Sequence, residues 1–403
     1  MAEAIKKQPS QTPIHFKDTS IAFQHKSDRD LLLSYMIFLL TKHPFLVKFL
    51  SKAAKLFLSM GLPVKPIIKA TVFRQFCGGE TPGEYQKVIQ QLGRACIGTI
   101  LDYSVEGGGD EAGFEETKNA ILQTIQQAET EENIPFACMK MTGIGAESLL
   151  QKMTAKKVLA KEDLQARERL KGRLAAICKQ AGQGGTPIYI DAEESWIQGA
   201  IDDLTEEMMQ TFNQKRSIVF TTLQLYRTDR VEYFKRLIVN AQHNAYRLGI
   251  KIVRGAYMEQ ERERARRFGY PSPIYPDKSA TDQAFDETIR LFMDNIEDVE
   301  ICVGTHNEVS CKLLADIMAE SGIPNNHPHV YFSQLYGMSD HISYKLAHAG
   351  YNVTKYLPFG PVASTLPYLA RRAEENTAIA GQMSKELEII VRERRRRRSV
   401  WTQ

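Results

Sequence analysis

Several sequence features that would assign this chain to a familiar class are missing. The six cysteines are widely scattered, and none forms a Cys-x-x-Cys pair or has metal-ligand spacing with a histidine. This pattern argues against a disulfide framework and a zinc site, and it indicates reduced, mostly buried thiols in an intracellular protein. We therefore expect no bound metal.

The glycine-rich signatures of nucleotide-binding enzymes are also absent. Neither 107–109 nor 184–185 is part of a Gly-x-Gly-x-x-Gly motif between a strand and a helix, and no Gly-x-x-x-x-Gly-Lys-Ser/Thr segment occurs. A dinucleotide would have to bind without the Rossmann loop. The motifs His-Glu-x-x-His and Gly-x-Ser-x-Gly, typical of zinc proteases and serine hydrolases, are missing as well.

Charge of one sign is not in large excess, and no apolar run is long enough to span a bilayer. The formal net charge of +4 over 403 residues does not indicate nucleic-acid binding. The longest apolar run, 31–40, ends in polar residues and a proline. The N-terminal segment lacks the apolar core of a signal peptide and does not resemble a mitochondrial presequence. We expect a bacterial cytoplasmic protein, with a peripheral position at the inner membrane left open.

The two ends of the chain carry patterns with two interpretations each. Residues 28–92 have apolar side chains at helical spacing with lysines between them. This predicts either a helical arm packed on the rest of the protein or a membrane-surface helix. Residues 392–398 are arginine apart from one glutamate, which predicts either a solvated, frayed helix end or a contact with anionic lipid or a partner.

Between these ends, short apolar segments alternate with longer amphipathic ones. The predicted strands are Ala95–Tyr103, Phe136–Met141, Pro187–Asp191, Ser217–Leu225, Ile250–Tyr257, Val299–Thr305, His329–Gln334 and Tyr351–Leu357. The clearest predicted helices are Asp163–Gln180, Arg230–Leu248, Thr281–Asn295 and Asn307–Ser321. Eight strand–helix repeats predict an α/β fold in which parallel strands close a (β/α)8 barrel. We divide the chain into an N-terminal helical arm at 1–92, a barrel domain at 93–385 and a basic tail at 386–403.

Polar side chains lie at or near the ends of seven consecutive predicted strands. They are Lys140, Asp191, Gln224, Lys251 and Arg254 together on the fifth strand, Thr305 with His306, Gln334 and Tyr356. A single charged residue in a buried strand can be a structural ion pair. Seven strands with polar groups at the same end instead predict a polar pocket, because catalytic groups of barrel enzymes lie at the carboxyl ends of the strands.

The last predicted helix, 362 to about 380, carries two adjacent arginines. Tyr368, Arg371, Arg372 and Glu375 are spaced i, i+3, i+4 and i+7, so they share one face. This face is either an ordinary solvated one or brings two guanidinium groups over the barrel mouth. Arginine binds carboxylates through paired, charge-assisted hydrogen bonds, so the second interpretation predicts an acidic substrate.

Five segments, taken together and in order, resemble the proline dehydrogenase family. They are Asp191-Ala-Glu193, Val253-Arg-Gly-Ala-Tyr257, Thr305-His-Asn307, Gln334-Leu-Tyr-Gly-Met338 and Tyr368-Leu-Ala-Arg-Arg-Ala-Glu-Glu-Asn376. The resemblance covers roughly residues 70–385. It implies a distorted barrel with the last helix across its mouth. It also implies FAD-dependent oxidation of L-proline to 1-pyrroline-5-carboxylate, by hydride transfer to flavin N5, with electrons passed to a quinone. A separate pyrroline-5-carboxylate dehydrogenase is then the pathway partner.

The resemblance also implies roles for individual residues. Those implied to bind the proline carboxylate are Lys140, Arg371 and Arg372. Those implied to line the ring pocket or act in catalysis are Asp191, Lys251, Tyr257 and Tyr356. Those implied to contact or support the flavin are Gln224, Arg254, Gly255, Ala256, Lys278, Thr281, Thr305, His306, Gln334 and Glu375. Lys251 stands where many bacterial members have arginine, so it resembles the eukaryotic branch and offers a point charge in place of a fork.

Three alternative functions remain open. One, from another class, is a binding protein that would use the arginine-rich tail on a membrane or a nucleic acid. A hydroxyproline dehydrogenase would share the fold, but Tyr356 would crowd a hydroxyl on the substrate ring, which favours proline. A Schiff-base lyase on the same barrel would use Lys140 or Lys251 as its nucleophile. No nucleic-acid partner is expected.

Overall fold

The computed structural model describes residues 14–40, 43–103, 109–366, 368–369 and 382–401. It divides into two compact units. Unit 1 contains residues 1–98, 104–106 and 334–403, and unit 2 contains residues 99–103 and 107–333. Five of the eight strands lie wholly in unit 2, together with most of the residues that the sequence marks as candidates for a site.

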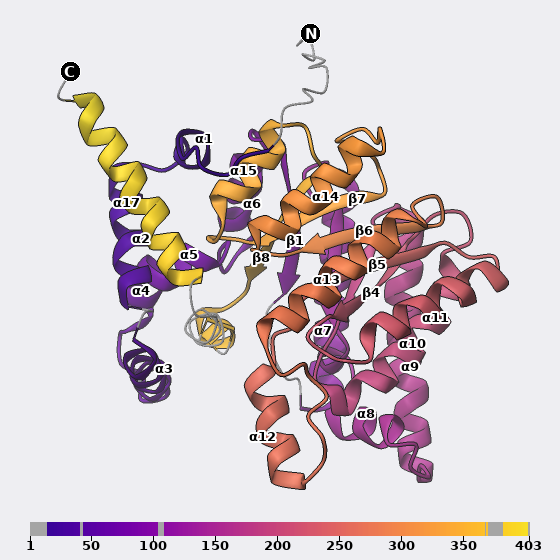
Figure 1. Ribbon diagram of the computed structural model, residues 1–403. Coiled ribbons are helices and arrows are strands. Elements are labelled where there is room, and N and C mark those ends of the chain that lie inside the picture. The colour runs from indigo at the N-terminus through magenta and orange to yellow at the C-terminus, as the bar shows by residue number, and fades with distance from the viewer. Residues whose placement is uncertain (1–13, 41–42, 104–108, 367, 370–381, 402–403) are drawn as a thin grey trace. The chain divides into compact units, whose positions relative to one another are not determined.

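Eight strands follow one another in sequence order around a closed barrel (Figure 1). They are β1 Ile97–Tyr103, β2 Phe136–Lys140, β3 Ile188–Asp191, β4 Val219–Gln224, β5 Leu248–Val253, β6 Val299–Gly304, β7 Val330–Leu335 and β8 Val353–Phe359. The predicted (β/α)8 barrel is confirmed, and seven strands end within two residues of their predicted bounds. The prediction for β5 was wrong at its end, because Gly255 takes a φ of +135° and the strand stops at Val253.

The helices of unit 2 connect its strands in the alternating order that the sequence predicts. They are α7 Glu111–Thr130, α8 Glu147–Thr154, α9 Lys161–Gly184, α10 Ser195–Phe212, α11 Arg230–His243, α12 Met258–Phe268, α13 Lys278–Met293 and α14 Glu308–Glu320. Asp110, Asp277 and Asn307 begin α7, α13 and α14 by accepting a hydrogen bond from a backbone N–H in the first turn. Helix α11 ends earlier than predicted, since the chain turns at Ala245 with a positive φ before it enters β5.

Aromatic side chains fill the amino-terminal part of the strands in unit 2. The Phe136 ring stacks on Tyr189 at 4.6 Å and meets Tyr331 edge-on at 4.8 Å, while Phe220 packs edge-on against Tyr189 at 5.2 Å. A Cβ atom at Gly249 would lie 2.7 Å from the Phe220 ring, so β5 needs a glycine there. This apolar packing leaves the carboxyl ends of the strands for polar groups.

Unit 1 contains the N-terminal helices, α15, β8 and the C-terminal helix. The helices are α1 Ser20–Phe23, α2 Asp28–Leu40, α3 Pro44–Ser59, α4 Lys65–Ile68, α5 Arg74–Phe76, α6 Pro82–Gly93, α15 Asp340–His348 and α17 Gln382–Trp401, with a π-helical turn at Lys69–Phe73. The predicted helices of residues 28–92 are confirmed. Helix α17 lies alongside α2 (Figure 1), and its Leu387 and Ile390 join a core with Leu31 and Phe38.

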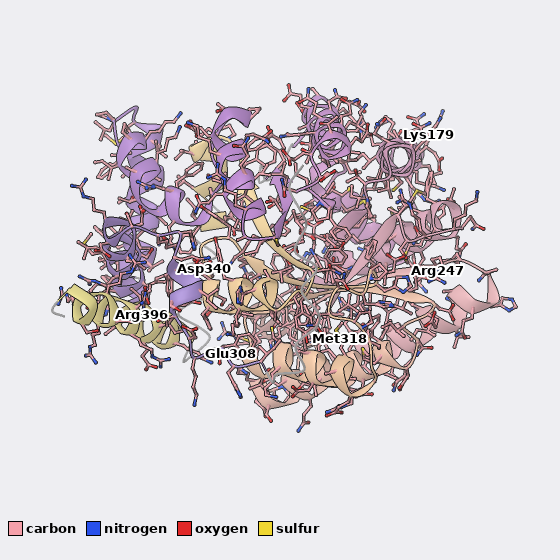
Figure 2. The ribbon with its side chains drawn as sticks, turned by 90° about the horizontal axis from the view of Figure 1, so that it is seen from above. Lys179, Arg247, Glu308, Met318, Asp340 and Arg396 are labelled. Carbon is pink, nitrogen blue, oxygen red and sulfur yellow. The ribbon has the colours of Figure 1, made fainter. Side chains whose placement is uncertain are left out.

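The arginine-rich end of the chain is helical rather than frayed. Glu393 is fully buried in α17 and accepts hydrogen bonds from Thr19 at 2.8 Å and from Arg396, labelled in Figure 2. Arg397 bonds the same carboxylate and also Asp28 at 2.8 Å. Part of the basic run therefore holds α17 against the N-terminal helices of unit 1.

Candidate active site

Two lysines and one aspartate meet at the carboxyl ends of strands in unit 2. Lys140 and Asp191 are register partners at the ends of β2 and β3. Asp191 forms an ion pair with Lys251 through Oδ1, and its Oδ2 lies 3.7 Å from Nζ of Lys140. Nζ of Lys251 also lies 5.1 Å from the centre of the Tyr189 ring. One carboxylate therefore lies between two ammonium groups that sequence reasoning had placed at separate strand ends.

Burial and charge have opposite effects on Lys140. Burial lowers the pKa of its amine, whereas the carboxylates of Asp102 and Asp191 raise it, and their charges prevail, so the pKa is well above its usual value. Lys140 is thus an ammonium ion at neutral pH. Its side chain is 25% exposed, against 7% for Lys251, so Lys140 is the more accessible of the two cations. A Schiff-base lyase needs a neutral amine, so this environment argues against Lys140 as the nucleophile of that alternative.

Asp102 is a polar strand end that sequence reasoning missed. It is the penultimate residue of β1, it is buried, and Sγ of Cys138 lies 3.8 Å from its Oδ1. A lone carboxylate in the apolar segment Ile97–Tyr103 was the signal that would have found it. Asp102 is thus a second carboxylate that acts on Lys140. The group then contains two lysines and two aspartates.

Arg254 follows β5 and is held by three side chains of unit 2. Its Nε donates to Asp282 at 2.7 Å, Nη1 to Thr305 at 2.6 Å and Nη2 to Ser310 at 3.0 Å. The guanidinium also lies 4.4 Å from the centre of the Phe285 ring. The structure thus brings together the predicted residues Arg254 and Thr305, and it adds Asp282 and Ser310, which the sequence analysis did not name.

Lys278 and Thr281 lie on α13 near this cluster, and His306 follows β6. Lys278 is exposed and pairs with the second oxygen of Asp282, an i, i+4 spacing that would have identified the aspartate. Thr281 is buried and donates to the backbone carbonyl of Asp277 at 3.2 Å. His306 is half-buried and is the second residue after the end of β6. Whether these three contact a cofactor stays a prediction.

Gly255 and Ala256 lie in the turn after β5, and Gln224, the last residue of β4, binds this turn. Gln224 donates from Nε2 to the Glu193 carbonyl at 2.7 Å and accepts from the Ala256 N–H at 3.2 Å. The buried amide therefore joins the loops after β3 and β5. A Cβ at Gly255 would lie 2.2 Å from the Tyr226 ring, so only glycine fits this turn.

Carboxylates gather after β3, beside Asp191. Glu193 is buried and accepts hydrogen bonds from both the backbone N–H and the hydroxyl of Thr142. Burial raises the pKa of Glu193 above its usual value despite these hydrogen bonds. Burial, together with the negative charges of Glu193, Glu147 and Glu261, raises the pKa of Glu194 to about 7. Glu194 is therefore half protonated near neutral pH.

The remaining candidates lie in unit 1, in the barrel loops, or outside the described residues. Gln334 is buried on β7 and accepts from the Ser343 hydroxyl at 2.8 Å. Tyr356 is half-buried on β8, and its carbonyl accepts from the N–H of Tyr336 at 2.9 Å. Tyr257 is buried after β5 in unit 2. Arg371, Arg372 and Glu375 lie outside the described residues.

A closed parallel barrel with charged groups at the carboxyl ends of its strands is the architecture of a (β/α)8-barrel enzyme. Comparison with known proteins places the chain more narrowly. The family model described as proline dehydrogenase matches residues 85–385. The chain belongs to the proline dehydrogenase family, a family of oxidoreductases.

Individual relatives agree with this assignment. The chain is 30% identical to mitochondrial proline dehydrogenase 1 of Dictyostelium discoideum, over 94% of this chain and 74% of that protein. It is 28% identical to a hydroxyproline dehydrogenase of Xenopus laevis, over 96% and 91%. Among solved structures, proline utilization A of Bdellovibrio bacteriovorus matches with a TM-score of 0.68 at 21% identity, over 77% of this chain and 33% of that one. That likeness shows the shared fold, and the chain spans about a third of the longer protein.

Proposed function

We propose that this protein is an FAD-dependent L-proline dehydrogenase that forms 1-pyrroline-5-carboxylate and passes electrons to a membrane quinone. The observation that carries the proposal is the group of Lys140, Asp191 and Lys251 at the strand ends of a chain from this family. Proline is small, so much of its binding energy must come from its carboxylate. An accessible ammonium ion at the strand ends, such as Lys140, meets that need.

The described residues fit FAD in the chemistry of their donors. FAD, when bound, accepts a hydride equivalent from the amino acid. Arg254 has five N–H donors, and its contacts within the described part of the chain use three of them. The other two suit an anionic or carbonyl edge of a cofactor. Lys251 brings an ammonium group, paired with Asp191, to the strand ends, and a cation near the flavin favours its electron-rich reduced state. The other cofactor-contact residues named above stay part of this proposal.

For the substrate, we propose that Lys140, Arg371 and Arg372 share the carboxylate. Three cations around one carboxylate can fix the ring in a single orientation, and such positioning can contribute several kcal/mol to catalysis. In this arrangement Asp191 holds Lys140 and Lys251 in place by charge, and it lines the ring pocket with Tyr257 and Tyr356.

Tyr356 supports proline over hydroxyproline. A tyrosine at this position of β8 fills the space that a hydroxyl on the substrate ring would need. Because the chain is similar to a hydroxyproline dehydrogenase, hydroxyproline is the second candidate substrate. The comparison that separates them is kcat/KM for L-proline against 4-hydroxyproline on the flavin-loaded protein, and a larger value for 4-hydroxyproline would contradict the proposal.

The test of the carboxylate assignment uses Lys140→Met in a proline–dye assay. A charged hydrogen bond is worth about 1.5–3 kcal/mol, so we expect KM for proline to rise roughly 10- to 100-fold with bound flavin retained. Arg371→Met should behave alike. Lys312→Met removes an exposed lysine on α14 and should leave KM unchanged. An unchanged KM in Lys140→Met would remove the carboxylate role, and a colourless protein that gains no activity with added FAD would overturn the whole proposal.

The partners follow from the same chemistry. Electrons leave for a quinone dissolved in a membrane, so the protein must meet a membrane surface. The product is a cyclic imine, which a separate pyrroline-5-carboxylate dehydrogenase would oxidise further. A pull-down of that dehydrogenase on the immobilised protein, with and without proline, would test the direct contact.

A further inference from the structure

We propose that α3 is the membrane-docking element of this protein and that its exposed apolar face lies in the plane of an anionic lipid surface. The inference rests on the proposed function only in that a quinone acceptor requires such a surface. It adds the segment that makes the contact and the lipid charge that the segment selects.

Helix α3 turns its apolar side chains outward. Phe45, Phe49, Leu56 and Met60, four residues at helical spacing, are 84%, 60%, 55% and 64% exposed. Val47, on another side of the helix, is 6% exposed. A surface helix of a globular protein normally buries its apolar stripe and exposes its polar one. Here a large part of the apolar stripe is exposed.

The exposed apolar surface extends beyond α3. Twelve of the eighteen large apolar side chains that are exposed among the described residues lie between Leu32 and Ile67. So many exposed apolar side chains in one stretch of the chain indicate a binding surface, because an isolated exposed side chain needs no explanation but a group does. Other apolar side chains of α2 are buried, in a core with α17 within unit 1, whereas the side chains of this group are exposed.

Charge decides which partner this surface fits. Residues 31–79 contain no aspartate or glutamate, although the chain has 48 of them in 403 residues. The same stretch holds seven basic residues, which are Lys42, Lys48, Lys52, Lys55, Lys65, Lys69 and Arg74. An apolar helix face accompanied by lysines, without a single carboxylate, complements the anionic headgroups and acyl chains of a bilayer. Lys65 and Lys69 pair with Glu80, and Arg74 pairs with Asp30, so the argument rests on the lysines within α3, which are Lys48, Lys52 and Lys55. A second copy of the chain would instead bring these lysines against their own kind.

The length of α3 indicates that it lies on the membrane rather than across it. Its 16 residues extend about 24 Å, less than the roughly 30 Å of a hydrocarbon core. No single helix in the described part of the chain is long and apolar enough to span. Helices α2 and α3 satisfy that test only when taken together, and they are bent by 103° at their junction.

The experiment measures binding of the full-length, flavin-loaded protein to vesicles by co-sedimentation. The vesicles are phosphatidylcholine with or without phosphatidylglycerol. We expect binding to the anionic vesicles, at least tenfold weaker binding to neutral ones, and a loss of binding at high salt. The double variant Phe45→Glu with Phe49→Glu should lose at least tenfold in affinity for anionic vesicles.

The matched control is a second double variant, which places two glutamates at exposed apolar positions of unit 2. Val158 and Val309 are 99% and 69% exposed, so Val158→Glu with Val309→Glu should bind vesicles as the unmodified protein does. All forms should reduce dye with proline equally. With a quinone dissolved in the vesicles, only the α3 variant should lose rate.

Three outcomes would overturn the docking proposal. One is an α3 variant that binds anionic vesicles like the control. Another is equal binding of the unmodified protein to neutral and anionic vesicles. The last is a concentration-dependent dimer that the α3 variant abolishes, without vesicle binding, which would assign the face to a second copy. Failure of proline–dye activity in the unmodified protein would overturn the proposed function instead, so the two failures are distinguishable.

Discussion

Asp191 shows how pairing at single residues depends on the barrel. Its carboxylate lies on β3 and pairs with Lys251 on β5, because side chains in one layer of a barrel come from alternate strands. The sequence places each residue at a strand end but does not say which strand ends meet. Removal of Asp191 would leave the buried Lys251 ammonium without this counter-ion, so we regard the pair as one unit that positions Lys140.

The raised pKa of Glu194 makes the stability of the folded protein depend on pH. The pKa of Glu194 in the folded protein, about 7, lies above that of an unfolded chain, so the folded state binds the proton more tightly. This tighter proton binding stabilises the folded protein fully at low pH, and the stabilisation is lost as the pH rises through about 7. Glu194→Gln should therefore raise the stability by about 1–2 kcal/mol near pH 8 and change it little near pH 4.

Thermal unfolding of both forms across this pH range measures the effect. Glu168→Gln, at an exposed position on α9, is the control and should show no such pH-dependent difference. A gain for Glu194→Gln that is constant with pH would show that burial and the neighbouring carboxylates do not raise the pKa of Glu194.

At the scale of elements, the loop after β5 shows that packing in the folded chain determines where a strand ends. The sequence Val253–Tyr257 looks like a continuous strand, yet the strand ends at Val253 and the next residues turn. Two facts of the folded chain impose this. Gly255 adopts a positive φ, and the Tyr226 ring occupies the place where a Cβ atom would lie. The turn then places the Arg254 guanidinium between α13 and α14, where Asp282 and Ser310 bind it.

Two glycine substitutions separate backbone strain from close packing. Gly269, after α12, has a φ of +71° and no atom within 4 Å of a built Cβ. We expect Gly269→Ala to cost about 1 kcal/mol, the usual price of a left-handed alanine. Gly255→Ala has the same kind of strain plus a 2.2 Å clash with Tyr226, so we expect a loss of about 3 kcal/mol or more. Urea unfolding measures both, and equal losses would show that the packing on Tyr226 is not decisive.

At the scale of the whole chain, a buried charge network joins segments far apart in the sequence. Asp340, labelled in Figure 2, lies at the start of α15 and is 2.9 Å from both Lys355 on β8 and Lys26. Burial raises the pKa of Asp340, but the two cations outweigh it and hold the pKa far below its usual range. The N-terminal segment, α15 and β8 of unit 1 therefore share one carboxylate.

Removing only the carboxylate of this network should destabilise unit 1 more than removing the carboxylate together with its buried lysine partner. Asp340→Asn leaves Lys355 buried without its counter-ion, and we expect a loss of about 3–5 kcal/mol. Adding Lys355→Met to that variant removes the stranded charge and should recover part of the loss. Asp316→Asn breaks an exposed pair with Lys312 and should cost less than 1 kcal/mol. Chemical denaturation of the unmodified protein, Asp340→Asn, Lys355→Met and the double variant gives the coupling energy, and strict additivity would contradict the shared role.

By itself the sequence determines the barrel and indicates where a candidate site lies. Periodic alternation of apolar and amphipathic segments specifies strands and helices locally, and the polar strand ends mark the carboxyl side. Only the tertiary structure decides which groups pair: Asp191 with Lys251, and Arg254 with Asp282. It also decides that α17 packs on α2 while α3 turns its apolar face outward. Pairing and exposure depend on residues distant in the chain, so no local pattern contains them.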